Sequence, residues 1–224
     1  MRSDLQPDGQ SRRTFIEEAR RAQIIEAAIE TIAEVGYAQA SLARIAQRAG
    51  ISKGVIAYHF AGKDELIAEV AATVLERAGA FMRPRIAAAS GGPAVLRAYI
   101  ESNLTFMGEH RDHLIAIVEI GRSARRSDGT SRVDLSALHT GAAGLAELLS
   151  RCQDAGELRD DFDPVVIAAA IRGAIDAIPP RLAVDPDLDV AHWGRELAHV
   201  FERATAVPPA RRRARANTSG DGGR

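Results

Sequence analysis

Apolar residues recur along most of this chain at the spacing of one helix face. The clearest examples are two consecutive stripes near the N-terminus, Ile25, Ala28, Ile29 and Ile32, followed by Leu42, Ile45, Ala46 and Ala49. Each stripe follows the i, i+3, i+4, i+7 pattern, which places its side chains on one side of an α-helix. Alanine-rich segments repeat this spacing, and 224 residues are enough to bury a real core. The sequence therefore predicts an all-α protein with little or no sheet.

Glycine and proline clusters divide the chain into about nine predicted helices. These residues stop helices through backbone freedom, left-handed geometry or a missing amide donor. In the larger C-terminal part, helices are predicted over 93–108, 110–124, 131–155, 163–178 and 189–206, with PPRLAVDPD at 179–187 among the breaks.

Both ends of the chain are predicted to be disordered. Residues 1–13 are polar and aperiodic, and residues 207–224 combine proline, glycine and arginine. The basic residues of this tail are Arg211, Arg212, Arg213 and Arg215. They either add non-specific affinity for a polyanion or keep the tail soluble, and the sequence leaves both readings open.

Charge and cysteine content exclude several classes of protein. The formal net charge is −1, which argues against coating nucleic acid through bulk charge but not against a local cationic site. The single cysteine, Cys152, excludes an internal disulfide, and no signal peptide is recognisable. No apolar run approaches the roughly 18 residues of a membrane span. We therefore expect a cytoplasmic protein with no membrane partner.

The stretch ISKGVIAYHF, residues 51–60, follows the second stripe directly. Ser52 is placed to cap a short helix, but Gly54 and its β-branched neighbours are poor helix formers, so tertiary packing must hold that helix. Ile56 and Phe60 are four residues apart and share the face that can pack on the preceding helices. The opposite face, which carries few charges, is predicted to point outward.

A helix of this size fits the major groove of B-DNA, which is about 12 Å wide. Glycine allows close approach of the backbone, valine can touch a thymine methyl group, and tyrosine, histidine and lysine donate to phosphates or base edges. The residues predicted to contact DNA here are Lys53, Gly54, Val55, Tyr58, His59 and Lys63. Both lysines of the chain are among them, and compact ammonium groups suit phosphate contacts. An ordinary helical hairpin with a solvated face would show the same spacing.

Residues 41–66, SLARIAQRAGISKGVIAYHFAGKDEL, resemble the DNA-binding region of the TetR family of transcriptional regulators. The resemblance covers about residues 20–75. It includes the isoleucine-rich first helix ending in GY, the I-A-x-x-A-G helix, the S-K-G opening, the Y-H-F ending and the K-x-E-L start of the next helix. It implies a three-helix, helix-turn-helix DNA-binding domain over 14–66, followed by a larger helical domain for ligand binding and dimerisation over 67–206.

The resemblance also implies a mode of action. Most members of the family are homodimeric repressors that bind double-stranded DNA at a palindromic operator and are released by a small-molecule effector. Ser41 and Ser52 join the six residues named above as implied DNA contacts. Many members carry an aromatic residue at the position of Ala57, so one contact is missing here and operator preference does not carry over.

From about residue 77 onward the resemblance is architectural only. The segment 165–178 is apolar almost all round, which favours burial on both sides, most simply against a second subunit. With the last predicted helix it resembles the four-helix dimer interface of the family. The predicted interface residues are Ile171, Arg172, Ile175, Trp193, Leu197, Val200 and Phe201.

The central helices of the larger domain would enclose the effector. The candidate ligand-binding residues are Tyr99, Asn103, Phe106, Met107, Ile117, Glu119, Gly121, Leu145 and Leu149. An aromatic and methionine stripe is more often plain core, and the polar members either bind a ligand or face water. His110 and His113 are spaced for a metal, but no third and fourth ligand lie at convincing spacing, so no metal site is predicted.

Two functions from different classes fit these features. The first is a DNA-binding transcriptional regulator, and the second is a helical ligand carrier or enzyme whose N-terminal bundle is only structural. No glycine-rich phosphate loop, G-x-S-x-G elbow or paired acid motif is present. The placement of the lysines and the lack of catalytic motifs favour the regulator, with no enzyme activity and no cofactor.

Overall fold

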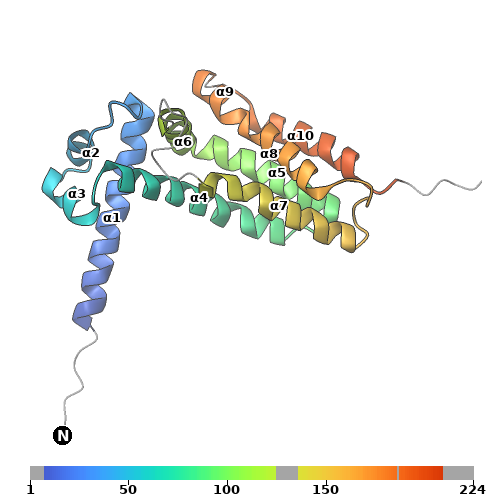
Figure 1. Ribbon diagram of the computed structural model, residues 1–224, viewed down its shortest axis with the longest axis horizontal. Helices are drawn as coiled ribbons and strands as arrows, with labels where there is room; N and C mark the ends of the chain where they lie inside the picture. Colours follow the sequence, from blue (N-terminus) through green and yellow to red (C-terminus); the bar gives the residue numbers. More distant parts are fainter. Residues whose placement is uncertain (1–7, 125–135, 186, 209–224) are drawn as a thin grey trace, which may run out of the picture.

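The computed structural model describes residues 8–124, 136–185 and 187–208, and these residues form ten helices without a strand (Figure 1). The helices are α1 (Asp8–Val35), α2 (Leu42–Arg48), α3 (Lys53–His59), α4 (Lys63–Ala87), α5 (Gly92–Glu109), α6 (Arg111–Ala124), α7 (Ser136–Asp154), α8 (Pro164–Asp176), α9 (Ile178–Val184) and α10 (Val190–Thr205). The predicted all-α class is confirmed. In this part of the chain, none of the helices combines the length and the apolar character needed to cross a membrane.

The first three helices form a small bundle around the two apolar stripes. Ile29 and Ile32 of α1 and Ile45 of α2 are completely inaccessible to solvent. Ser41 caps α2, because its hydroxyl accepts a hydrogen bond from the Arg44 amide at 3.3 Å. The spacing of the stripes and the cap both agree with the sequence-based prediction.

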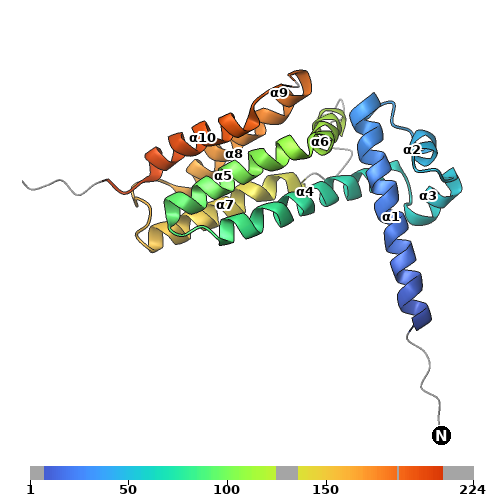
Figure 2. The same ribbon diagram turned by 180° about the vertical axis from the view of Figure 1, so that it is seen from behind.

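Helix α4 carries the chain from this bundle into the larger domain (Figure 1 and Figure 2). It packs on α1 in the bundle and on α5 in the larger domain. In that domain α5 is central, because α4, α6, α7, α8 and α10 all contact it. The fold thus places the α2–α3 pair at one end of the molecule, away from α7, α8 and α10.

Two features differ from the prediction, and two predicted segments lie partly or wholly outside the described residues. Helix α1 begins at Asp8, so residues 8–13 are helical rather than disordered, because an established helix extends cheaply through helix-forming residues. Helix α9 begins at Ile178 and covers the first part of the predicted break at 179–187, because its prolines stand in the first turn, where no amide donor is needed. The predicted helix 131–155 is described from Ser136 onward. The tail residues Arg211, Arg212, Arg213 and Arg215 also lie outside the described residues.

Helix α8 has one buried face and one exposed face. Ile171 and Ile175 are fully buried within the chain itself, so their assignment to a dimer interface is wrong. They fill the side of α8 that packs on α7 and α5. The opposite side leaves Val166, Ala169 and Gly173 exposed. The apolar sequence of this helix thus supplies both faces, but only one of them is covered within a single chain.

The last helix also divides its apolar residues. Trp193, Leu197 and Phe201 are half-buried and pack against the core, whereas Val200 is 56% exposed. Of the interface residues predicted on α10, Val200 is therefore the one that points most clearly to solvent.

Candidate DNA-binding surface

A tight turn joins α2 to α3 and fixes the angle between them. Gly50 has a φ of 65°, a left-handed conformation that glycine adopts without strain. The amides of Gly50 and Ile51 donate to the carbonyls of Gln47 and Ala46 at 3.1 and 3.0 Å. These bonds end α2 and direct the chain into α3.

The inner face of α3 holds this short helix in place. Ile56 and Phe60 are only 1% and 2% exposed, within the core of the bundle. Arg21 of α1 contacts the end of α3. Its guanidinium donates to the carbonyl of His59 at 2.5 Å and lies 4.4 Å from the Phe60 ring centroid. Tertiary packing therefore supports a helix whose own sequence favours helix only weakly.

The outer face of α3 points to solvent, as predicted. Lys53, Gly54 and Tyr58 are exposed there, and Val55 and His59 are half-buried beside them. Tyr58 is 75% exposed and meets the His59 ring edge-on, with ring centroids 5.0 Å apart. A tyrosine this exposed presents both its ring and its hydroxyl to a partner.

Gly54 is not required by the fold of the protein. Its φ is not left-handed, and an added Cβ would meet only the Ser52 hydroxyl oxygen at 3.7 Å, which is ordinary contact. A glycine inside a helix costs about 1 kcal/mol relative to alanine. The missing side chain therefore leaves room for something outside the chain to approach the backbone of α3.

Two serines and an arginine border this surface. Ser52 stands at the N-cap of α3 and is exposed, but its side chain makes no capping bond, contrary to the prediction. Arg44, which we did not predict, is exposed on α2, three residues after Ser41 and thus on the same helix face. Arg48 is different, because it pairs with acidic residues of α1, including Glu30 at 3.3 Å.

Lys63 is half-buried, and its ammonium group contacts the turn after α1. Its Nζ donates to the carbonyl of Tyr37 at 2.7 Å and lies 4.1 Å from the centre of the Tyr37 ring. Burial lowers the pKa of Lys63, although the neighbouring Asp64 raises it. The phosphate contact of Lys63 stays a prediction, and in this structure the start of α4 lies beside the turn after α1, whose carbonyl accepts from the lysine. Here Lys63 ties α4 to that turn.

A polar cluster joins the bundle to the larger domain. Arg77 of α4 donates to the Glu26 carboxylate of α1 at 2.7 Å, and its guanidinium lies 2.6 Å from Nε2 of His113 on α6. The His113 side chain is 12% exposed. Burial lowers the pKa of His113, and Arg77 lowers it further, against the opposing effect of Glu26. Three helices from both parts of the protein thus meet at one neutral imidazole.

The pH dependence of this cluster is predictable in sign. The pKa of His113 lies below its ordinary value of 6.5, so the unfolded chain takes up the proton first as the pH falls through that value. We expect the melting temperature to drop between about pH 7.5 and about pH 5.5, and to drop less in His113→Gln, whose amide can still bond Arg77. Thermal melts at both pH values measure the difference. His192→Gln, at an exposed position on α10, should keep the wild-type dependence. Equal slopes in wild type and His113→Gln would contradict the prediction.

Glu119 was predicted as a ligand-binding residue, and the structure places it elsewhere. Its carboxylate lies against Gly36, within 3.2 Å of where a Cβ would stand, and pairs with Arg122 at 3.7 Å. Gly36 follows α1 and has a φ of 76°. The position of Glu119 on α6, which packs across α1, accounts for this difference. Glu119 therefore contacts the N-terminal bundle rather than the interior of the larger domain.

The other candidate ligand residues fall into two groups. The buried residues of α5 and α7 are Tyr99, Asn103, Phe106, Met107, Leu145 and Leu149. Ile117 and Gly121 of α6 are half-buried. His110 stacks on Phe106 with ring centroids 4.2 Å apart, which accounts for a histidine at this position without a metal. Over the described residues no cluster of histidine, cysteine and acidic side chains is suited to a metal ion.

Known proteins are similar to this chain in the region that contains α2 and α3. The model of a family described as "Bacterial regulatory proteins, tetR family" matches residues 24–70. The HTH-type transcriptional regulator BetI 1 of Chromohalobacter salexigens is 42% identical over 85 residues, which are 38% of this chain and 42% of that protein. The chain thus aligns with less than half of the length of this relative.

A second relative matches over most of its length. The HTH-type transcriptional repressor Rv1474c of Mycobacterium tuberculosis is 31% identical over 169 residues, which are 75% of this chain and 85% of that protein. The fatty acid degradation regulator FadR from Bacillus halodurans has the same fold, with a TM-score of 0.73 at 22% identity over 82% of this chain and 94% of that chain. The similarity to the second relative and to FadR extends from the N-terminal bundle into the larger helical domain, and this chain belongs to the TetR family of bacterial transcriptional regulators.

Proposed function

We propose that this protein is a sequence-specific repressor that binds a palindromic operator as a homodimer and is released by a small-molecule effector. The observation that carries the proposal is the outer face of α3, where the fold does not require Gly54 and where Lys53 and Tyr58 point to solvent. Such a helix suits the major groove, with the backbone close to the bases at the glycine. Residues 14–66 act as the DNA-binding domain, and residues 67–206 bind the effector and the second subunit.

In this arrangement each side chain has a defined task. Lys53 reaches a guanine edge or a phosphate, and Val55 touches a thymine methyl group. Tyr58 and His59 donate to the phosphates along the edge of the groove. Ser41 and Ser52, at the starts of α2 and α3, contact the sugar-phosphate backbone of the DNA. Arg44 adds a positive charge beside Ser41.

The exposed face of α8 supports the homodimer. Val166, Ala169, Ala170, Gly173 and Ala177 follow one another at helical spacing, and this stripe contains no charged residue. Small residues let two helices approach closely, and covering such a stripe removes apolar surface from water. These residues, with Val200 of α10, replace the inward-facing Ile171 and Ile175 as the proposed interface.

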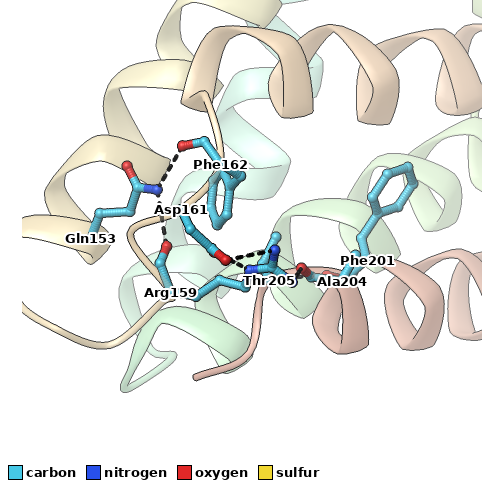
Figure 3. A network of polar contacts seen from close by, with 7 residues as sticks. All are labelled: Gln153, Arg159, Asp161, Phe162, Phe201, Ala204 and Thr205. Carbon is cyan, nitrogen blue, oxygen red and sulfur yellow. Dashed lines mark hydrogen bonds and ion pairs between the residues drawn. The ribbon is translucent and has the colours of Figure 1, made fainter. Parts of the chain in front are cut away.

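A network at one end of the domain fixes α8 relative to α10 (Figure 3). In the loop that leads into α8, the Arg159 amide donates to the Thr205 carbonyl at 3.0 Å, and its guanidinium donates to the Ala204 carbonyl at 3.3 Å. Gln153 of α7 donates from Nε2 to the carbonyls of Arg159 and Phe162, both at 3.0 Å. Helix α8 therefore begins where α10 ends, so both can belong to one interface.

The contacts between the two domains support effector control. Helices α4 and α6 both touch α1, through Arg77, His113 and Glu119, and both also contact α5 of the larger domain. An effector that shifts these helices changes the separation of two recognition helices, which must lie about 34–36 Å apart on DNA. The relatives named as a repressor and as a regulator of fatty acid degradation are consistent with such control. Coupling of this kind is typically worth about 1–3 kcal/mol and acts equally in both directions.

The first test uses DNA from the region flanking the gene. We expect Lys53→Ala and Tyr58→Phe each to weaken binding by about 1–3 kcal/mol, because each removes one contact, while the melting temperature stays unchanged. Fluorescence anisotropy at one fixed salt concentration measures both affinities. Arg195→Ala, at an exposed position on α10, is the matched control and should bind as the wild type does. An unchanged affinity in the Lys53→Ala/Tyr58→Phe double variant would rule out α3 as the recognition helix.

A further inference from the structure

Arg172 is a charged residue in an unusual place. It follows the fully buried Ile171 on α8, and its side chain is only 19% exposed. A guanidinium removed from water loses hydration, and that loss is normally offset by a well-aligned acidic partner. The hydrogen-bond partners of Arg172 therefore decide how far this loss of hydration is offset.

The partners of Arg172 fill its hydrogen-bonding capacity only in part. NH1 donates to the Asn103 amide oxygen at 3.2 Å and to the Tyr99 hydroxyl at 3.4 Å, and both acceptors are neutral. NH2 donates to the carboxylate of Asp176, one turn further along α8, which is 58% exposed. Exposed pairs at this spacing contribute little. Among the described residues, Nε of Arg172 has no hydrogen-bond acceptor. The planar fork of guanidinium N–H groups is therefore not paired with a bidentate carboxylate.

The neighbouring side chains are held in position around this fork. Tyr99 and Asn103 are each 8% exposed, and Asn103 is fixed by a hydrogen bond from its Nδ2 to the Tyr99 carbonyl at 2.9 Å. The Tyr99 hydroxyl is only 3.5 Å from the Gly141 carbonyl, a weak bond that an acceptor of higher charge can replace. An added Cβ on Gly141 would lie 3.7 Å from Nε of Arg172, so this glycine keeps the space beside the fork free of a side chain.

The region around this polar group is apolar. Met107 follows Asn103 by one turn on α5, and Leu145 and Leu149 follow Gly141 by one and two turns on α7. All three are at most 5% exposed. A ligand that reaches Arg172 from this side therefore needs an apolar body and one anionic group.

We infer that Arg172 binds the carboxylate of the effector, and that the Tyr99 hydroxyl is the second donor to it. This inference rests on the proposed function, because it names the class of molecule that the larger domain recognises: a small apolar carboxylic acid. The incoming carboxylate replaces the exposed Asp176 as the partner of the fork and offers the two parallel acceptors that a guanidinium prefers. Because Arg172 lies on α8, the same contact pulls on the helix that carries the proposed dimer interface.

The experiment uses the full chain labelled with ¹⁵N on arginine and two matched pairs of probes. The acids are octanoate and benzoate, and their uncharged partners are 1-octanol and benzyl alcohol. The Nε–H signal of Arg172 is identified by its loss in Arg172→Met and Arg172→Lys. We expect at least one acid to shift this signal saturably and its alcohol to leave it unchanged. The inference is overturned if neither acid shifts the Arg172 signal.

Calorimetry with the acid that binds then tests the energetics. We expect Arg172→Met to lower its affinity at least about tenfold, Arg172→Lys to lower it less, and Tyr99→Phe to lower it several-fold. Arg151→Met, at an exposed position on α7, is the control and should keep the wild-type affinity. Unchanged affinity in both Arg172→Met and Tyr99→Phe means that the acid binds elsewhere and overturns the inference. If Arg172→Met does not fold, the inference is tested by the affinity of Tyr99→Phe and by the shift of the Arg172 Nε–H signal in the wild-type protein.

Operator binding, measured in parallel, separates this inference from the proposed function. A protein that binds DNA through α3 but gives no Arg172 shift keeps the proposed function and loses the inference. A protein that binds the acid at Arg172 but binds no DNA keeps the site and loses the repressor. In a protein that binds both, the acid is expected to weaken DNA binding, and an acid without effect on DNA affinity overturns its role as the effector.

Discussion

Gly54→Leu is expected to abolish operator binding while making the folded protein slightly more stable. The fold leaves space at Gly54, where an added Cβ meets only the Ser52 hydroxyl at 3.7 Å, and leucine favours a helix by up to about 1 kcal/mol over glycine. On DNA the same side chain would stand between α3 and the floor of the groove. We expect the affinity to fall at least about 100-fold, or about 2.7 kcal/mol, by anisotropy. The melting temperature should stay the same or rise.

Operator affinity should fall while stability rises, so a loss of DNA binding in Gly54→Leu cannot be explained by unfolding. Gly144→Leu is the matched control, because Gly144 also lies exposed in a helix, with no atom within 4 Å of an added Cβ. It should gain similar stability and keep full DNA affinity. Wild-type operator affinity in a folded Gly54→Leu protein would show that the outer face of α3 does not approach DNA closely.

Ala169→Asp is expected to give a folded monomer that no longer holds its operator. Ala169 lies in the uncharged, exposed stripe of α8, so the change is tolerated in a single chain but buries an unpaired charge in a dimer. We expect sedimentation velocity to give a monomer at micromolar concentration. Because both half-sites must be held together, operator affinity should fall at least about 100-fold.

Two further variants serve as controls for Ala169→Asp. Ala143→Glu, at an exposed position on α7, should remain dimeric and bind DNA normally. Ile171→Asp should instead unfold the protein, with a loss of at least about 4 kcal/mol of unfolding free energy, because Ile171 is buried within the chain. A dimeric Ala169→Asp protein would place the subunit contact on another surface, and a wild-type chain that sediments as a monomer would remove the homodimer from the proposal.

Much of the DNA-binding bundle could be predicted from the sequence because its determinants are local. The stripe that includes Ile29 and Ile32 involves residues within two helical turns, and the Ser41 cap bonds an amide three residues away. The inward direction of Ile56 and Phe60 followed from their spacing of four residues, which turned Tyr58 outward. Local periodicity and capping chemistry are encoded in neighbouring residues, so the sequence alone determined these features.

Contacts between distant residues were decided only by the tertiary structure. Lys63 bonds the carbonyl of Tyr37, 26 residues away, and Arg77 reaches Glu26 across 51 residues. No local pattern marks such pairs, because they depend on where α4 crosses α1. The same holds for Glu119, whose carboxylate lies at the end of α1 rather than inside the larger domain.

Helix α8 shows most clearly the difference between what local sequence determines and what distant contacts decide. Its sequence is apolar almost all round, so periodicity predicted burial but did not distinguish the face with Ile171 and Ile175 from the face with Ala169 and Gly173. That choice depends on α5 and α7, which present the larger apolar surface on one side and Tyr99 beside Arg172 at its edge. The sequence alone determined that this helix is apolar enough to be buried on any side. The packing of helices far away in the chain decided which side is covered, because free energy is gained only where complementary surfaces meet.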